Sequence, residues 1–187
     1  MSLIYYLPGW NGELGTGLGL ELMNRGFEVT GRETRGEFKD FTFTEQVQVV
    51  LEDLRDNFWT ADSLVVAVSF GAYLFLHAQT GLPLFPGKVL LLSPIVGGFS
   101  DQKTGRVFSP PQQDKLLGAA TASKYPKLTR CEVHTGSEDW QSHPQAVTTF
   151  FKLIGVEAHV ADGLGHSLGS DYVGKILDTW LPPTCQG

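Results

Sequence analysis

A serine at the junction of a buried strand and a helix is the residue in this chain best suited to nucleophilic chemistry. Residues 64–68 form an uncharged, β-branched run, which predicts a strand buried on both faces of a parallel sheet. From Phe70 onward the apolar residues recur at helical spacing. Ser69 therefore falls on a sharp strand-to-helix turn, where a strained backbone would push its hydroxyl out above the sheet. Ala67 and Gly71, two residues to either side, are both small, as we expect if these positions pass each other closely.

A serine hydroxyl is a weak nucleophile near neutral pH and needs a base within hydrogen-bond reach. His166 follows a glycine-containing loop that would let its imidazole swing back to Ser69, remove the proton and return it to a leaving group. The imidazole in turn needs a carboxylate that fixes its tautomer. Glu138 and Asp139 are adjacent candidates after a predicted strand, and Asp101 is a more distant one.

Six predicted strands alternate with helices along the chain, which implies a parallel sheet with right-handed crossovers. The strands are expected at residues 3–7, 27–30, 64–68, 88–92, 130–135 and 156–161. Helices are expected at residues 15–22, 45–59 (capped by Thr44), from 70 onward, 112–123, 144–154 and 170–181. Reactive groups in such sheets gather at the carboxyl ends of the strands, and Ser69, Asp139 and His166 all follow strand ends.

The chain order Ser69, Asp139, His166 is similar to that of the α/β-hydrolase triad, and the sequence around Ser69 resembles that family's nucleophile elbow, G-x-S-x-G. Ala67 stands where the motif has its first glycine. The family's usual spacing, a glycine, two further residues and then aspartate, favours Asp139 over Glu138 as the acid.

The resemblance extends from residue 3 to residue 181 and implies an α/β fold. We expect about six parallel strands in the order 2-1-3-4-5-6 with helices on both faces, lacking the first two antiparallel strands of the full-length fold. Residues 1–187 would form a single domain. Residues 95–127 match least well and are expected to form at most a short cap or insertion.

The resemblance also implies where the oxyanion of the reaction would bind. It assigns the two backbone N–H donors to Phe70 and to Trp10 in the loop after the first strand. Pro8 stands where many relatives carry histidine. Trp10, Phe99 and Trp140 cluster in sequence around these positions and are predicted to wall an open, apolar acyl or alcohol pocket.

The expected function is a serine hydrolase that cleaves a small carboxylic ester through an acyl-enzyme, with a thioester or amide as related substrates. Two alternatives remain at this point: a hydrolase fold that binds a ligand or a protein without turnover, and an acyltransferase that uses the same triad. No two histidines have metal-ligand spacing and no nucleotide-binding glycine motif is present, so neither a metal nor a cofactor is expected.

The amino-acid composition argues against some classes of binding partner. The formal net charge is −6 and no Lys/Arg cluster occurs, which argues against nucleic acid and an anionic membrane surface. No apolar run reaches membrane-spanning length. Residues 1–10 lack the basic segment and cleavage site of a secretory signal, and Cys131 and Cys185 are expected to be reduced. A cytoplasmic location is therefore expected.

Overall fold

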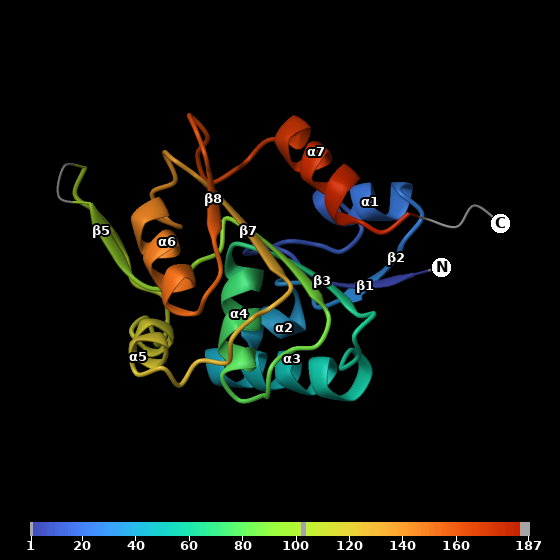
Figure 1. The fold of residues 1–187 in the computed structure, drawn as a ribbon, viewed down its shortest axis with the longest axis horizontal. Coiled ribbons are helices and arrows are strands. Elements are labelled where there is room, and N and C mark those ends of the chain that lie inside the picture. Colours follow the sequence, from blue (N-terminus) through green and yellow to red (C-terminus); the bar gives the residue numbers. More distant parts are fainter. Residues whose placement is uncertain (1, 102–103, 184–187) are drawn as a thin grey trace.

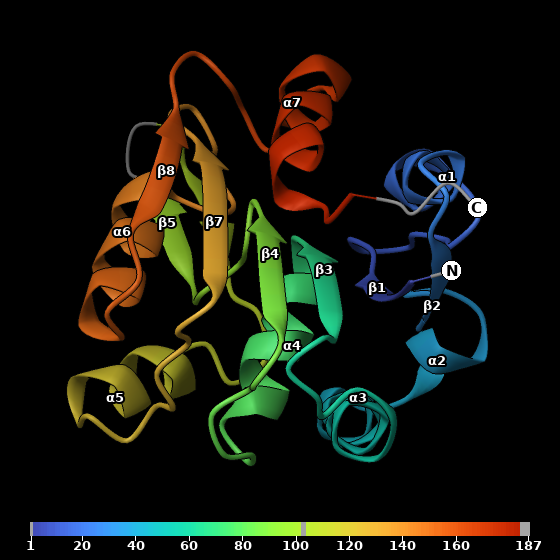
Figure 2. The same ribbon diagram turned by 45° about the vertical axis from the view of Figure 1, so that its right-hand side comes forward.

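The structure is a computed structural model that describes residues 2–101 and 104–183. Its centre is a parallel sheet of six strands in the order β2-β1-β3-β4-β7-β8 (Figures 1 and 2). The predicted order is confirmed, because β7 and β8 are the fifth and sixth strands of this sheet. The strands are Leu3–Leu7 (β1), Glu28–Gly31 (β2), Leu64–Val68 (β3), Lys88–Leu92 (β4), Cys131–Gly136 (β7) and Ala158–Ala161 (β8).

The central strands are buried on both faces, as their continuous apolar sequences predict. Tyr6, Val66 and Leu90 lie side by side in register and belong to one hydrophobic core. Their neighbours Tyr5 and Val65 point to the opposite face and belong to the other, larger core. Strand alternation thus divides the interior into two cores, one on each side of the sheet.

Helices cover both faces of the sheet (Figure 2). One core is closed by α1 (Gly17–Asn24) and α7 (Ser170–Trp180). The larger core is closed by α3 (Phe43–Asn57), α4 (Phe70–Gln79), α5 (Lys115–Thr121) and α6 (Pro144–Leu153), with the short α2 (Glu37–Asp40) beside them. None of the described helices is long and apolar enough to cross a bilayer.

The start of α3 differs from the prediction, which placed the cap at Thr44. Thr42 is the cap: its hydroxyl accepts the Glu45 N–H at 3.4 Å, and the Glu45 carboxylate accepts the Thr42 N–H at 2.7 Å. This reciprocal capping box satisfies two backbone donors at once, which a cap at Thr44 without a glutamate three residues later could not do. The prediction of Thr44 as the cap is therefore wrong.

Residues 95–127 contain a second, two-stranded antiparallel sheet that the sequence did not predict, formed by β5 (Phe99–Asp101) and β6 (Arg106–Phe108). This hairpin packs against the loop after β7. The Phe99 ring stacks on His143 with 4.4 Å between centroids, and the Arg106 guanidinium lies 5.2 Å from the Trp140 ring centroid. The predicted helix at 112–123 corresponds to the shorter α5.

Candidate active site

Ser69 connects β3 to α4 in a conformation that non-glycine residues rarely adopt, with φ 51° and ψ −114°. Its N–H donates to the Leu92 carbonyl at 3.0 Å, which fixes the turn against β4. The predicted strained turn at Ser69 is therefore present, and the hydroxyl faces the loops at the carboxyl end of the sheet.

The small residue at position 71 has a different cause from the one expected. A Cβ added at Gly71 would lie 2.2 Å from the Leu7 carbonyl oxygen and 2.5 Å from that of Pro8. The glycine is required because α4 begins directly against the end of β1. This close approach of Gly71 to the first strand is a contact that the sequence did not predict.

Three side chains from separate loops meet at this turn. The Ser69 Oγ lies 2.8 Å from His166 Nε2, and His166 Nδ1 lies 2.9 Å from Asp139 Oδ2 and 3.0 Å from Oδ1. Asp139 is almost fully buried, with 1% of its surface exposed, and its Oδ1 also accepts the N–H groups of Gln141 and Ser142, each at 2.9 Å. Two backbone donors thus hold the Asp139 side chain in place, and it orients the imidazole.

The other two acids considered from the sequence were Glu138 and Asp101. Glu138 is exposed, and its backbone N–H donates to the Leu164 carbonyl at 2.9 Å. Asp101 is part of β5 in the hairpin. The carboxylate that the structure brings to His166 is that of Asp139.

The loop that carries His166 is in close contact with the segment that leads to Asp139. A Cβ added at Gly136 would lie 2.1 Å from the Leu164 carbonyl oxygen and 2.4 Å from that of Gly165. The absence of a side chain at Gly136 therefore lets the two loops touch, and this contact sets the distance between imidazole and carboxylate.

The loop after β1 reaches Ser69 from the other side. A Cβ at Gly9 would lie 3.5 Å from the Ser69 Cβ. Within the described part of the chain, the N–H groups of Trp10 and Phe70 have no hydrogen-bond acceptor. Two free donors flanking a hydroxyl are what a tetrahedral oxyanion requires.

Sequence reasoning missed the residue that holds this loop. Thr34 is buried, its hydroxyl donates to the Gly9 carbonyl, and it accepts the Gly12 N–H at 2.9 Å. Its backbone N–H donates to the Gly12 carbonyl at 3.1 Å, and its carbonyl accepts the Asn11 N–H at 3.2 Å. Nothing local in the predicted polar loop marks this threonine, because its partners are more than twenty residues away.

Two further serines, also missed, connect the backbone of His166 to the carboxylate of Asp139 through hydrogen bonds. Ser93 Oγ donates to the His166 carbonyl at 2.8 Å, and Ser142 Oγ donates to the Ser93 carbonyl at 2.5 Å. Since the Ser142 N–H bonds Asp139, the chain of contacts closes on itself. We call these contacts the Ser93–Ser142 link. Ser93 has φ 45° and is 1% exposed, so it is a strained and buried residue at the end of β4.

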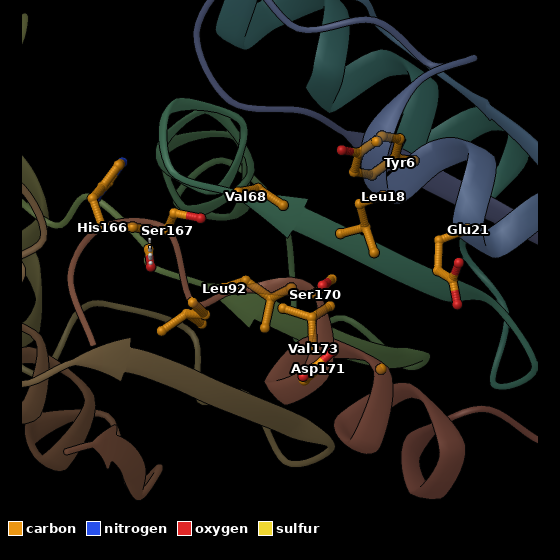
Figure 3. A pocket seen from close by; sticks show the side chains of 15 residues that line it. Tyr6, Leu18, Glu21, Val68, Leu92, His166, Ser167, Ser170, Asp171 and Val173 are labelled. Carbon is orange, nitrogen blue, oxygen red and sulfur yellow. Dashed lines mark hydrogen bonds between the residues drawn. The ribbon is translucent and has the colours of Figure 1, made fainter. Parts of the chain in front are cut away.

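The three aromatic residues predicted to wall a pocket lie in different surroundings. Trp10 is 57% exposed and meets Phe70 edge-on, with 4.9 Å between centroids. Phe99 and Trp140 lie at the contact between the hairpin and the loop after β7. None of the three lines the cavity of about 660 Å³ that borders His166 (Figure 3). Phe99 lines a separate cavity of about 410 Å³ near α5 and α6.

His77 is a buried histidine, two turns beyond Ser69 on α4. Burial, with a smaller contribution from the positive charge of Lys115, lowers the pKa of His77 to about 3. The ring packs edge-on against Phe43 and Tyr73, and neither nitrogen has a hydrogen-bond partner among the described residues. His77 is therefore neutral near pH 7 and points into the core.

Other potential ligand groups are few. The described residues contain no cluster of three or more His, Cys, Asp or Glu side chains that could hold a metal ion. Cys131 lies in β7 as a free thiol, and burial raises its pKa well above the usual range. Cys185 lies outside the described residues.

No family model and no curated protein matches the sequence, whereas solved structures match the fold. A monoacylglycerol lipase from Paleococcus ferrophilus is 14% identical with a TM-score of 0.66, covering 94% of this chain and 92% of that one. TT1662 from Thermus thermophilus is 20% identical with a TM-score of 0.63, covering 98% and 90%. SOBER1 from Arabidopsis thaliana is 16% identical with a TM-score of 0.58, covering 95% and 96%.

These similarities extend over nearly the full length of each chain. The chain has the fold of a small α/β-hydrolase.

Proposed function

We propose that the protein is a serine hydrolase that cleaves a small carboxylic ester through an acyl-enzyme intermediate. The observation that carries the proposal is the serial contact of Ser69 Oγ, the His166 imidazole and the Asp139 carboxylate, at 2.8 Å and 2.9 Å. A binding module has no need for a strained, hydrogen-bonded hydroxyl of this kind. The Paleococcus neighbour is a monoacylglycerol lipase, which agrees with ester chemistry.

Each proposed step has a group suited to it. His166 Nε2 takes the proton of Ser69 as Oγ attacks the ester carbonyl carbon, and the resulting oxyanion accepts the N–H groups of Trp10 and Phe70. Asp139 keeps the Nδ1 proton of the imidazole in place and stabilises the imidazolium. His166 then gives the proton to the leaving alcohol oxygen, and the C–O bond breaks to leave an acyl group on Ser69.

Water completes the cycle by the same route. His166 removes a proton from a water molecule, the hydroxide attacks the acyl carbon, and the Ser69 oxygen leaves with the proton from His166. The carboxylic acid is released and the free hydroxyl is restored.

The test is turnover of p-nitrophenyl esters with acyl chains of increasing length, and of a matched thioester. We expect Ser69→Ala to reduce kcat by about 10⁶-fold, because the nucleophile and its base act as a unit. Turnover by Ser69→Ala close to that of the unaltered protein would contradict the proposal.

A further inference from the structure

The cavity that borders His166 lies between α1 and α7, at the carboxyl ends of the strands (Figure 3). Its volume of about 660 Å³ is within the range of small-molecule sites, roughly 300–1,000 Å³. Most of the surface that lines it is apolar, and its apolar side chains come from three strands and both helices: Tyr6, Val68, Leu92, Leu18 and Val173. Three serines also line it, Ser93, Ser167 and Ser170. An apolar group of a bound molecule would therefore fit in it.

The charges at this cavity are already balanced. Two carboxylates line it, Glu21 and Asp171, and no lysine or arginine is among its lining residues. Glu21 pairs with Arg25 at 3.0 Å. Asp171 lies in the first turn of α7, where the positive end of the helix dipole offsets its charge. An uncharged group is therefore favoured over either an acid or an amine.

One hydroxyl in the lining lacks a hydrogen-bond partner among the described residues. Tyr6 is 4% exposed, its hydroxyl has no hydrogen-bond partner in the described part of the chain, and burial raises its pKa to about 12. The hydroxyl end of the ring is turned toward the His166 end of the cavity in the view of Figure 3. A protonated hydroxyl in an apolar lining provides one donor for an oxygen of the occupant.

We infer that this cavity holds the alcohol portion of the ester, an uncharged apolar group with an oxygen acceptor for Tyr6. The inference rests on the proposed hydrolase function. In the tetrahedral intermediate the oxyanion lies at Trp10 and Phe70, whereas the leaving oxygen must lie at His166, which protonates it. His166 borders the cavity, whereas Ser69 and the two oxyanion donors do not, so we assign the cavity to the group attached to the leaving oxygen, on the His166 side of the tetrahedral carbon.

The experiment compares two ester series: acetates with alcohols from ethyl to 2-phenylethyl, and ethyl esters with acyl chains from acetyl to phenylpropanoyl. Leu18→Trp fills the cavity, and Leu20→Trp is the matched control, because Leu20 is exposed on the same helix and does not line the cavity. Gly174→Leu is a second filling variant, since a Cβ there would have Arg25 Nη2 as its nearest neighbour, at 3.7 Å.

We expect both filling variants to lower kcat/KM for 2-phenylethyl acetate at least tenfold, mainly through KM, while ethyl acetate changes less than about twofold. Leu20→Trp should leave both unchanged. Tyr6→Phe should lower kcat/KM about two- to tenfold for acetates whose alcohol carries an ether oxygen, the effect of one hydrogen bond. A loss confined to the acyl series, an equal loss in both series, or no loss with either filling variant would overturn the inference.

Failure of the inference is distinguishable from failure of the proposed function. A fluorophosphonate that labels Ser69 in the unaltered protein and in Leu18→Trp supports the hydrolase, whatever the alcohol series shows. If the unaltered protein is neither labelled nor active on either series, the proposed function fails, and the assignment of the cavity to the alcohol fails with it.

Discussion

Removal of the Ser93 hydroxyl tests whether the Ser93–Ser142 link positions the imidazole. Ser93→Ala deletes the 2.8 Å hydrogen bond to the His166 carbonyl and leaves that buried acceptor without its donor. Such a loss costs about 1–3 kcal/mol. If the cost is expressed as misplacement of the imidazole, kcat/KM falls by about 5- to 150-fold, since about 1.4 kcal/mol corresponds to a factor of ten.

The assay is ester turnover together with the rate of Ser69 labelling by a fluorophosphonate, measured alongside the melting temperature. The matched control is Ser137→Ala, because Ser137 Oγ accepts the Gly163 N–H at 2.8 Å in the same pair of loops but in an exposed position outside the link. We expect the control to change kcat/KM less than about threefold. Equal effects of the two variants, or an unchanged labelling rate in a destabilised Ser93→Ala, would refute a positioning role.

Three other predictions follow from the contacts described. Asp139→Asn should lower kcat by about 10⁴-fold in the ester assay, whereas Glu138→Gln should stay within about threefold, and the reverse ranking would contradict the assignment of the acid. Gly136→Ala should lower kcat/KM at least about tenfold, because its Cβ would lie 2.1 Å from the Leu164 carbonyl oxygen, and unchanged activity would contradict loop contact as the cause. The pKa of His77 is lowered to about 3, so as the pH falls below 6.5 the unfolded chain takes up a proton that the folded chain does not, and stability is lost. His77→Leu should remove about 2 kcal/mol of that loss near pH 5 in urea unfolding, and an unchanged pH dependence would contradict it.

The sheet could be predicted because its signals are local. Short, uncharged, β-branched runs such as residues 64–68 are typical of central strands, and their alternation with segments of helical spacing indicates a parallel sheet. The strained turn at Ser69 could be predicted for the same reason, since the change of period occurs at one residue. Thr42 and Glu45 also have the spacing of a capping box, which could have been recognised from the sequence in place of Thr44.

The remaining features depend on contacts between distant segments. Thr34 and Ser93 are ordinary residues in sequence, and their functions arise only when three loops meet at one end of the sheet. The strands of the hairpin, Phe99–Asp101 and Arg106–Phe108, have three residues each and show no alternation long enough to detect. The ring contacts of the aromatic residues also join distant segments, since Trp10 contacts Phe70 and Trp140 contacts Arg106.

The most direct measurement is the intact mass of the protein after brief treatment with a fluorophosphonate, followed by peptide mapping. If Ser69 is a nucleophile activated by His166, one adduct forms on the peptide that contains Ser69, and neither Ser69→Ala nor His166→Gln is labelled at a comparable rate. An adduct on another residue, or equal labelling of the His166→Gln variant, would contradict the account.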